Sequence, residues 1–573
     1  MRQAYSRSCD GRAEATDAGS LSRGGRTSVT HVTGGSTRRW SDNSLTRRSF
    51  VKGVGAATGT GALAALLAGC GASNASSGTV STSSDGKKTF TYGIATDPLV
   101  SPNPITSSDR YGLMTVKLVY SSLWQYNADG INYFLADSYD VDDDSTVITA
   151  HLHEGVTWND GEPFTADDVV YTFESVEATP TAASYSNLVT DQGSVKVEKV
   201  DDNTVSFTFP APNPDIVELV SGIFIMPKHL YEGVTDFENN DVNTKGVGTG
   251  PYKLEEYATG QYLRFSANES YFLGKPNIDE VVFQIITNEN TMTQSIQAGS
   301  INAMVSSPSE VQQMDLSGNN LTVHPYSEGN IAFLAVNCRR VTDENVRKAL
   351  LFSFDKKAIA DAALLSDEYY SLEYTFLPVE NSFYNEDGVE KYDRDVEKSK
   401  QLLSAAGKTN PTFKFAYPSD DSSTEAEAVL MKEQAAEAGI TLDLQALDAN
   451  AVYSLATEPD NEYDLYFGGY VMGIDPSTFY PEFGIGQKWN YMHWGEEYSN
   501  IEDLFAQGKA ETDQDKRYDI YHELQKAIQD TGAFYPIYEK KRLLVTTGNV
   551  TDIDAAKLVP VYTFEDMSKL NMQ

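Results

Sequence analysis

The chain has 573 residues, too many for one ordinary hydrophobic core, so two or three domains are expected. Its 44 Lys and Arg against 82 Asp and Glu give a net charge of −38, which argues against a general nucleic-acid binder because phosphate backbones would repel it. Its three cysteines exclude a disulfide framework and a thiolate metal cluster, and the interior holds no apolar run of membrane-spanning length.

Residues 1–69 have the organisation of an export signal. A polar, basic stretch precedes Arg47-Arg48, and a run rich in Gly, Ala and Leu follows over 53–66. The paired arginines also resemble a twin-arginine signal, so the route of export stays open between that route and the general secretory one. The run ends at Leu67-Ala68-Gly69-Cys70, which resembles a bacterial lipobox, and Cys70 is therefore the predicted site of lipid attachment. The long stretch before the arginines leaves the true start of translation open.

Residues 70–88 are rich in Gly, Ser and Thr and predict a flexible tether between the lipid and a folded body. Exported hydrolases, binding proteins and adhesins all use such tethers, so this segment does not choose between them. After removal of 1–69, Cys338 is the only free thiol, and no catalytic motif surrounds it.

The folded body is predicted to begin with a strand at 89–94. Residues 147–153 alternate between apolar and polar side chains, which predicts a half-buried strand with Ile148, Ala150 and Leu152 on one face. Thr165 lies three residues before Asp168, which predicts a capping box at the start of a helix. The apolar stripe of this helix is Val169, Phe173 and Val176.

Further along, Gly248-Thr249-Gly250-Pro251 predicts a turn that leads into a strand at Tyr252. Helices are predicted over 343–354, over 393–406 and over 513–529. The second of these helices is expected to begin at Asp393 and to end at Gly407. Strands and helices alternate throughout, which indicates a mixed α/β class without internal repeats.

Candidate chemical sites have weak support in the sequence. His151 and His153 share one face of a strand, but no third ligand accompanies them, and Asp142-Asp143-Asp144 lacks the spacing of a calcium loop. Pro251 has no N–H to offer a phosphate at the glycine-rich turn. No nucleophile elbow and no H-E-x-x-H sequence is found, although paired carboxylates for glycoside hydrolysis stay possible. We therefore predict no catalytic residues, no metal and no cofactor.

Aromatic residues are abundant, with 33 Tyr, 25 Phe and 5 Trp. Most of them are expected in cores or on the surface. Tyrosine nevertheless suits a cleft that holds varied ligands, because it offers a flat apolar ring with one hydrogen-bonding tip.

Three stretches have a more specific pattern. The first runs from Leu135-Ala136-Asp137-Ser138-Tyr139 into residues 151–169, HLHEGVTWNDGEPFTADDV. The second joins Gly248-Thr249-Gly250-Pro251-Tyr252 to Asn268-Glu269-Ser270-Tyr271-Phe272. The third joins Asn345-Val346-Arg347-Lys348-Ala349-Leu350 to Phe354-Asp355-Lys356. Over about 89–570 the chain resembles the family 5 extracellular solute-binding proteins, which are the oligopeptide- and dipeptide-binding components of ABC importers.

The resemblance implies an α/β, two-lobed clamp of the periplasmic-binding-protein type (type II, cluster C-like) with an extra inserted domain. Lobe I is expected to be discontinuous, over 89–126, 233–305 and 540–573. The inserted domain II is expected over 127–232, and lobe III over 306–539. In such a clamp the ligand lies between lobes I and III, and closure encloses it.

The residues that the resemblance implies for the ligand cleft are Asp97, Pro98, Tyr185, Tyr470, Val471, Met472, Gly473, Asp475 and Tyr538. The family's amine-binding segment has the form G-W-x-x-D-x-x-[DE]-P. Here Tyr470 replaces the aromatic residue, Gly473 stands at about the inner aspartate, and Asp475 matches the outer acid before Pro476. A second acid of some peptide binders is Ala335 here. Both differences weaken the expectation that a free peptide amine is the main anchor of the ligand.

The function implied is binding without turnover. A monomeric receptor, anchored through Cys70 on the extracytoplasmic face of the cell membrane, would capture oligopeptides and deliver them to an ABC permease, with no nucleic-acid partner. The same fold could instead bind an oligosaccharide, a nickel chelate or another small solute. A secreted glycoside hydrolase and a surface adhesin are the alternatives from other classes.

Overall fold

The computed structural model of the protein describes residues 86–573, apart from 128–129, 191, 421 and 472–474. The predicted export signal, Cys70 and the tether up to residue 85 lie outside the described residues. The elements below all belong to one compact unit of the chain. Within them, no helix combines the length and the apolar character that crossing a bilayer requires.

The first large sheet has seven strands in the order β10-β11-β12-β1-β13-β21-β14. Strand β1 pairs in parallel with β12 and β13, and the other neighbours are antiparallel. Its strands are β1 (Thr89–Ile94), β10 (Tyr252–Ala258), β11 (Tyr262–Ala267), β12 (Glu280–Ile285), β13 (Ala303–Ser306), β14 (Leu321–Tyr326) and β21 (Arg542–Thr547). The helices of this part are α2 (Arg110–Val119), α7 (Glu289–Gln297), α8 (Pro308–Gln313) and α17 (Ile553–Ala556).

The second large sheet has six strands in the order β16-β20-β15-β19-β17-β18. They are β15 (Asn330–Val336), β16 (Tyr370–Leu372), β17 (Thr412–Pro418), β18 (Thr441–Leu447), β19 (Leu465–Val471) and β20 (Phe534–Lys540). The helices of this part are α9 (Glu344–Leu351), α10 (Lys356–Leu364), α11 (Val396–Ala405), α12 (Ser422–Glu437), α13 (Ala449–Ala456), α14 (Tyr480–Phe483), α15 (Ser499–Ala510) and α16 (Gln514–Asp530), with 3-10 turns η3 (Asp367–Tyr369), η4 (Pro476–Phe479) and η5 (Glu496–Tyr498).

A third, four-stranded sheet of order β4-β5-β9-β8 lies within the span predicted for the inserted domain. It contains β4 (Ala136–Val141), β5 (Val147–Leu152), β8 (Lys196–Asp201) and β9 (Thr204–Thr208), beside α3 (Ala166–Ala178). The predicted strand and capping box are confirmed, since Ile148, Ala150 and Leu152 are buried on β5, and Thr165 and Asp168 bond reciprocally at the start of α3.

Short elements complete the chain. They are β2 (Trp124–Asn127), β3 (Gly130–Tyr133), α4 (Tyr185–Leu188), β6 (Val189–Thr190), β7 (Gly193–Ser194), α5 (Ile216–Val220), α6 (Lys228–Tyr231), η2 (Asp241–Thr244), β22 (Val550–Thr551), β23 (Leu558–Val559), β24 (Thr563–Phe564), η6 (Met567–Lys569) and β25 (Asn571–Met572).

The later predicted helices all form, but two of their boundaries were wrong. The helix predicted over 343–354 ends at Leu351, and Phe354 is buried outside it. The helix predicted from Asp393 begins instead after Asp395, whose side chain accepts the N–H of Lys398; it ends before Gly407, which has a positive φ of 66°. The third is confirmed as α16, capped by Asp513.

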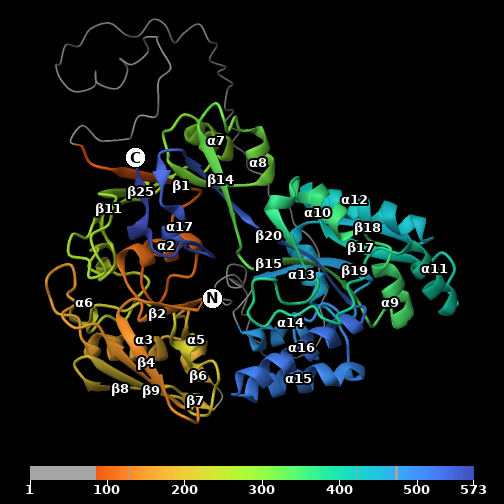
Figure 1. Ribbon diagram of the computed structural model, residues 1–573, viewed down its shortest axis with the longest axis horizontal. Coiled ribbons are helices and arrows are strands. Elements are labelled where there is room, and N and C mark those ends of the chain that lie inside the picture. The colour runs from red at the N-terminus through yellow and green to blue at the C-terminus, as the bar shows by residue number, and fades with distance from the viewer. Residues whose placement is uncertain (1–85, 128–129, 191, 421, 472–474) are drawn as a thin grey trace, which may run out of the picture. The chain divides into compact units, whose positions relative to one another are not determined.

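Sheet membership differs from the expected domain division in one place. Residues 306–326 were expected in lobe III, yet β14 is hydrogen bonded to β21 in the seven-stranded sheet. The chain therefore passes between the two large sheets at 327–329, and it returns at Lys541, between β20 and β21. Strands β15 and β20, which follow and precede these crossings, lie side by side in the second sheet (Figure 1). We refer to 327–329 and Lys541 as the crossing.

The Gly248-Thr249-Gly250 turn packs tightly against the end of α2. The Gly250 N–H donates to the Val119 carbonyl at 2.8 Å. A Cβ on Gly248 would lie 1.8 Å from that carbonyl oxygen, and a Cβ on Gly250 would lie 2.6 Å from the Leu118 oxygen. Both glycines are thus required by close approach of two backbones.

Gly248→Ala is therefore expected to lower the free energy of unfolding by about 1–3 kcal/mol, because the added methyl group forces two backbones apart. Urea unfolding followed by circular dichroism measures the change. Gly469→Ala is the matched control, since its Cβ would lie 3.4 Å from the nearest atom. Equal stability of the two variants would contradict the packing argument.

Candidate functional site

A buried ion-pair network connects the predicted inserted domain with the six-stranded part of the protein. Arg517 on α16 places Nη2 2.6 Å from Oδ2 of Asp475 and 2.8 Å from Oδ1 of Asp215. Asp215 directly precedes α5, whereas Asp475 directly precedes η4. One guanidinium thus pairs with two carboxylates, Asp215 and Asp475, that lie 260 positions apart in the sequence. We call these three residues the Arg517 network.

The network is almost fully withdrawn from water, with Arg517 2% exposed and Asp475 3% exposed. Burial raises the pKa of Asp215 to about 7; repulsion from Asp475 adds to the shift, and the Arg517 charge opposes it. The arrangement follows from charge balance, because one guanidinium cannot neutralise two buried carboxylates and a proton on Asp215 removes the excess.

Asp475 also organises its own segment. Its Oδ1 accepts the N–H of Ser477 at 2.8 Å, which fixes the first turn of η4, and lies 3.5 Å from the Tyr521 hydroxyl. The predicted amine-binding acid is thus engaged by the protein's own cation. Its role toward a ligand stays a prediction, and a ligand amine would have to compete with Arg517 for it.

The predicted cleft residues Asp97, Pro98 and Tyr185 contact the part of the protein around the seven- and four-stranded sheets. Asp97 accepts the Tyr257 hydroxyl at 3.0 Å and the Gly260 N–H at 2.9 Å, and so holds the β10–β11 hairpin. Pro98 beside it is buried. Tyr185 opens α4 and packs half-buried against the large core that the seven- and four-stranded sheets share.

The predicted cleft residues Tyr470 and Tyr538 lie in the six-stranded sheet, on β19 and β20, which both pair with β15. Tyr470 on β19 is buried, donates its hydroxyl to the Phe376 carbonyl at 2.6 Å and has its ring centroid 5.5 Å from that of Phe333 on β15. Tyr538 on β20 is buried and donates its hydroxyl to Glu427. The backbone of Val471 pairs with Asn330 of β15, and Met472 and Gly473 lie outside the described residues.

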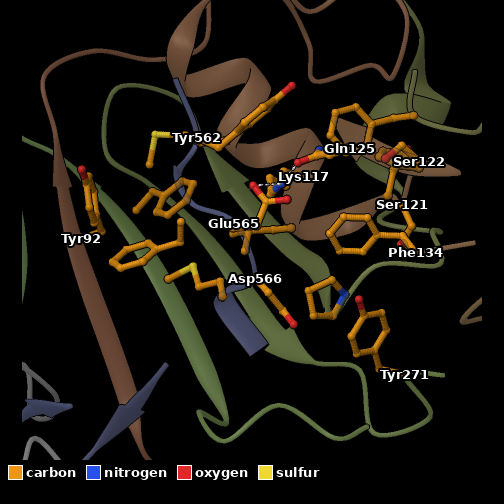
Figure 2. A pocket seen from close by; sticks show the side chains of 18 residues that line it. Tyr92, Lys117, Ser121, Ser122, Gln125, Phe134, Tyr271, Tyr562, Glu565 and Asp566 are labelled. Atoms are coloured by element: carbon orange, nitrogen blue, oxygen red, sulfur yellow. Dashed lines mark hydrogen bonds and ion pairs between the residues drawn. The ribbon is translucent and has the colours of Figure 1, made fainter. Parts of the chain in front are cut away.

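A small cavity lies where α2, β1, β12 and the C-terminal segment meet, and none of its lining residues comes from the six-stranded sheet. It has a volume of about 30 Å³, which suits about two water molecules, so it is too small for a peptide. Figure 2 shows Lys117 at its centre, beside Gln125 and Glu565. Burial lowers the pKa of Lys117 to about 8, while the Glu565 charge opposes the shift. The cavity therefore does not account for the ligand cleft that the resemblance implies.

The other candidates from the sequence have local roles. His151 pairs with Asp140 at 2.9 Å and His153 with Asp137 at 2.6 Å, so each imidazole has its own carboxylate partner. Asp142 accepts the N–H groups of the β4–β5 turn, which confirms it as a turn residue.

The thiol of Cys338 has no environment that would activate it. Cys338 is buried, and burial raises the pKa of its thiol to about 11. Very little thiolate is therefore present at neutral pH, and a nucleophilic role lacks support.

Sequence reasoning missed the Arg517 network, although one signal was present. Arg517 lies four residues before Tyr521 and seven before Leu524, on the apolar stripe of α16. A charged residue on a buried stripe requires a buried partner. The sequence could have predicted an ion pair there, but not the identity of Asp215 or Asp475 as the partners.

Much of the chain matches a known protein family. Residues 130–491 match the sequence profile of the bacterial extracellular solute-binding proteins, family 5 (middle region). The chain belongs to this family. The chain is 27% identical to the oligopeptide-binding protein AppA of Bacillus subtilis over 76% of this chain and 84% of that protein. It is 26% identical to the dipeptide-binding protein of Escherichia coli over 75% of this chain and 85% of that protein.

Solved structures agree with this assignment. The ABC transporter substrate-binding protein CtaP of Listeria monocytogenes has a TM-score of 0.79 at 33% identity, covering 85% of this chain and 99% of that one. A peptide-binding protein AppA of Clostridium difficile has a TM-score of 0.76 at 28% identity, covering 84% and 100%. The expected α/β two-lobed clamp is confirmed, and the chain is a binding protein rather than an enzyme.

The Arg517 network predicts a pH dependence of stability. Asp215 keeps a proton up to about pH 7 in the folded protein, but in the unfolded chain only below about pH 4. The folded state binds more protons in this window, so it gains stability through Asp215 as the pH falls from 8 to 5 and loses it as the pH rises.

Asp215→Asn should therefore raise the thermal midpoint at pH 8 relative to the wild type, and the difference between the two proteins should shrink toward pH 5. Differential scanning calorimetry at both pH values measures it. Asp140→Asn, which alters an exposed pair, is the control. A difference independent of pH would contradict the assigned protonation.

Proposed function

We propose that this protein is the substrate-binding component of an ABC importer and that it captures oligopeptides between lobes I and III. The observation that carries the proposal is the similarity to oligopeptide- and dipeptide-binding relatives over about three quarters of the chain. Delivery to a permease and anchoring through a lipid on Cys70 belong to the same proposal. They rest on the family resemblance and on the lipobox at 67–70.

The geometry of the crossing supports capture by closure. The two large sheets are joined at 327–329 and at Lys541, two short passages that lie side by side between β14 and β15 and between β20 and β21. Rotation about so narrow a connection changes the separation of the lobes while each sheet keeps its hydrogen bonds. A solute enclosed in this way is released unaltered when the lobes separate.

We further propose which residues face the ligand, following the family resemblance. They are Asp97, Pro98, Tyr185, Tyr470, Val471, Met472, Gly473, Asp475 and Tyr538. The internal partners of several of these side chains assign them a positioning role: Asp97 holds a hairpin, and Asp475 holds the turn after Gly473. An extended peptide would then be bound mainly through its main chain, which tolerates varied side chains.

The ligand class is tested by native mass spectrometry of the purified protein, followed by calorimetric titration. A peptide of two to nine residues in the native spectrum, and saturable binding of synthetic peptides, are expected. Titrations with a nickel–histidine chelate and with an oligosaccharide form the comparison arms. Binding of one of these solutes with no peptide binding would replace the proposed ligand, and cleavage of a bound peptide would refute the binding-only role.

Asp475→Ala is expected to weaken peptide binding at least tenfold, because it removes the predicted cleft acid and the acceptor that holds the turn at Ser477. Isothermal titration calorimetry measures the affinity, and circular dichroism checks the fold. Asp475→Asn keeps the acceptor for Ser477 and separates loss of charge from loss of the turn. Asp460→Ala, at an exposed ion pair, is the control. An unchanged affinity of Asp475→Ala would remove Asp475 from the ligand site.

The anchor has its own test. Cys70→Ser should abolish incorporation of radiolabelled fatty acid into the protein and release it from the membrane fraction, since a serine hydroxyl does not replace the thiol in lipid transfer. Cys338→Ser is the matched control, because that thiol is buried in the folded body. Equal labelling of wild type and Cys70→Ser would contradict the lipobox assignment.

A further inference from the structure

Three glutamates converge beside the crossing. Glu373 directly follows β16, Glu539 lies on β20, and Glu380 lies in the segment after Glu373. One carboxylate oxygen from each lies within 4.8 Å of those of the other two. The pairing of β16 with β20 creates this arrangement, because it places Ser371 opposite Glu539. We call Glu373, Glu380 and Glu539 the glutamate cluster.

Two of the three carboxylates are fully buried with unused oxygens. Glu373 and Glu539 are both 0% exposed. Among the described residues, no donor meets full hydrogen-bond geometry at either oxygen of Glu373 or at Oε2 of Glu539. The Val379 N–H is near enough only to oppose the raised pKa of Glu373. A buried carboxylate oxygen without a donor destabilises the folded state, and native proteins normally avoid it. A bound ion would supply the missing partner for these oxygens.

The Glu539 side chain is held in place by hydrogen bonds to its other carboxylate oxygen, Oε1. Oε1 accepts the N–H of Gly329 at 2.7 Å, the N–H of Glu328 at 3.1 Å and the hydroxyl of Ser327. With Oε1 engaged by the crossing, Oε2 is left toward Glu380 and Glu373. The orientation of this carboxylate is therefore fixed by the backbone.

The neighbouring cation does not satisfy the cluster. Lys356 is buried and donates its ammonium to the main-chain carbonyl of Glu373 rather than to the carboxylate. The same ammonium lies 4.3 Å from the ring centroid of Tyr374 and 4.8 Å from that of Tyr535. Even a fully charged Lys356 leaves two of the three negative charges without compensation.

The uncompensated negative charge also affects the pKa values of Glu373 and Glu539. Burial raises the pKa of Glu539 to about 7, and repulsion from Glu380 adds to it. Burial likewise raises the pKa of Glu373 well above its usual range, and Glu539 and Glu380 add to the effect.

We propose that Glu373, Glu380 and Glu539 form a binding site for one divalent cation of the calcium type, next to the crossing between the two large sheets. Carboxylate oxygens are the ligands that hard cations prefer, and Ca²⁺ accepts them at 2.3–2.6 Å in a flexible shell that water completes. Exposed Glu380 gives the ion access from solvent. Mg²⁺ requires shorter, near-octahedral distances and is expected to bind more weakly.

The test uses the full chain after treatment with EDTA, titrated with CaCl₂ alone at pH 7.5. Isothermal titration calorimetry should show about one ion per chain, and 5 mM CaCl₂ should raise the thermal midpoint. Glu380→Gln removes an exposed carboxylate of the cluster, so it should weaken Ca²⁺ binding at least tenfold, and circular dichroism of the metal-free variant checks that the fold is kept. Glu368→Gln, an exposed glutamate close by in the sequence, is the matched control and should bind Ca²⁺ as the wild type does.

A second variant changes a buried residue of the cluster, Glu373. Glu373→Gln should abolish the response to Ca²⁺, because an amide at this buried position brings no negative charge to the ion. Absence of heat and of a midpoint shift for wild type in CaCl₂ and MgCl₂ would overturn the proposal, as would wild-type affinity in Glu380→Gln. No peptide is present in these titrations, so their failure leaves the proposed transport function untouched.

Discussion

The structure depends on how two buried glutamates hold the crossing. Glu328 accepts Arg110 at 2.5 Å and Arg542 at 2.6 Å, which ties the passage to the seven-stranded sheet. Glu539 accepts the backbone of 328–329 from the other sheet. Because charge-assisted hydrogen bonds are strong in a dry environment, these carboxylates fix a passage that has no regular strand pairing of its own. The relative placement of the two lobes therefore rests on very few side chains.

The Arg517 network and the glutamate cluster follow the same electrostatic rule. At the Arg517 network one guanidinium pairs with two carboxylates, and at the glutamate cluster three carboxylates converge while the nearby Lys356 ammonium bonds a main-chain carbonyl. Each of them carries excess negative charge in a dry place, and each relieves it by taking up protons or a cation. A protein with a net charge of −38 thus buries part of its negative charge at these two places.

Local features were predictable because they are encoded within a few residues. The capping box at Thr165, the alternation along β5 and the cap of α16 each depend on spacings of two to four positions. The start of α11 was misplaced because Asp393 and Asp395 are equally good caps in sequence, and only tertiary packing selects Asp395.

The family resemblance supplied the architecture and the segment around Asp475, but the partner of Asp475 lies 42 positions further along, at Arg517. The glutamate cluster was beyond sequence reasoning altogether, because Glu373 and Glu539 meet only through the pairing of β16 with β20. Contacts of this kind depend on topology, which spacing along the chain does not contain.

The aromatic packing inside the six-stranded part has a mechanical consequence. Phe333 on β15 lies 5.5 Å from Tyr470 on β19 and 5.0 Å from Phe534 on β20, measured between ring centroids. Such interlocked rings resist shear, so the three strands translate as one rigid body. A displacement of β19 would therefore be expected to move β20 with it, and β20 leads directly into the crossing at Lys541.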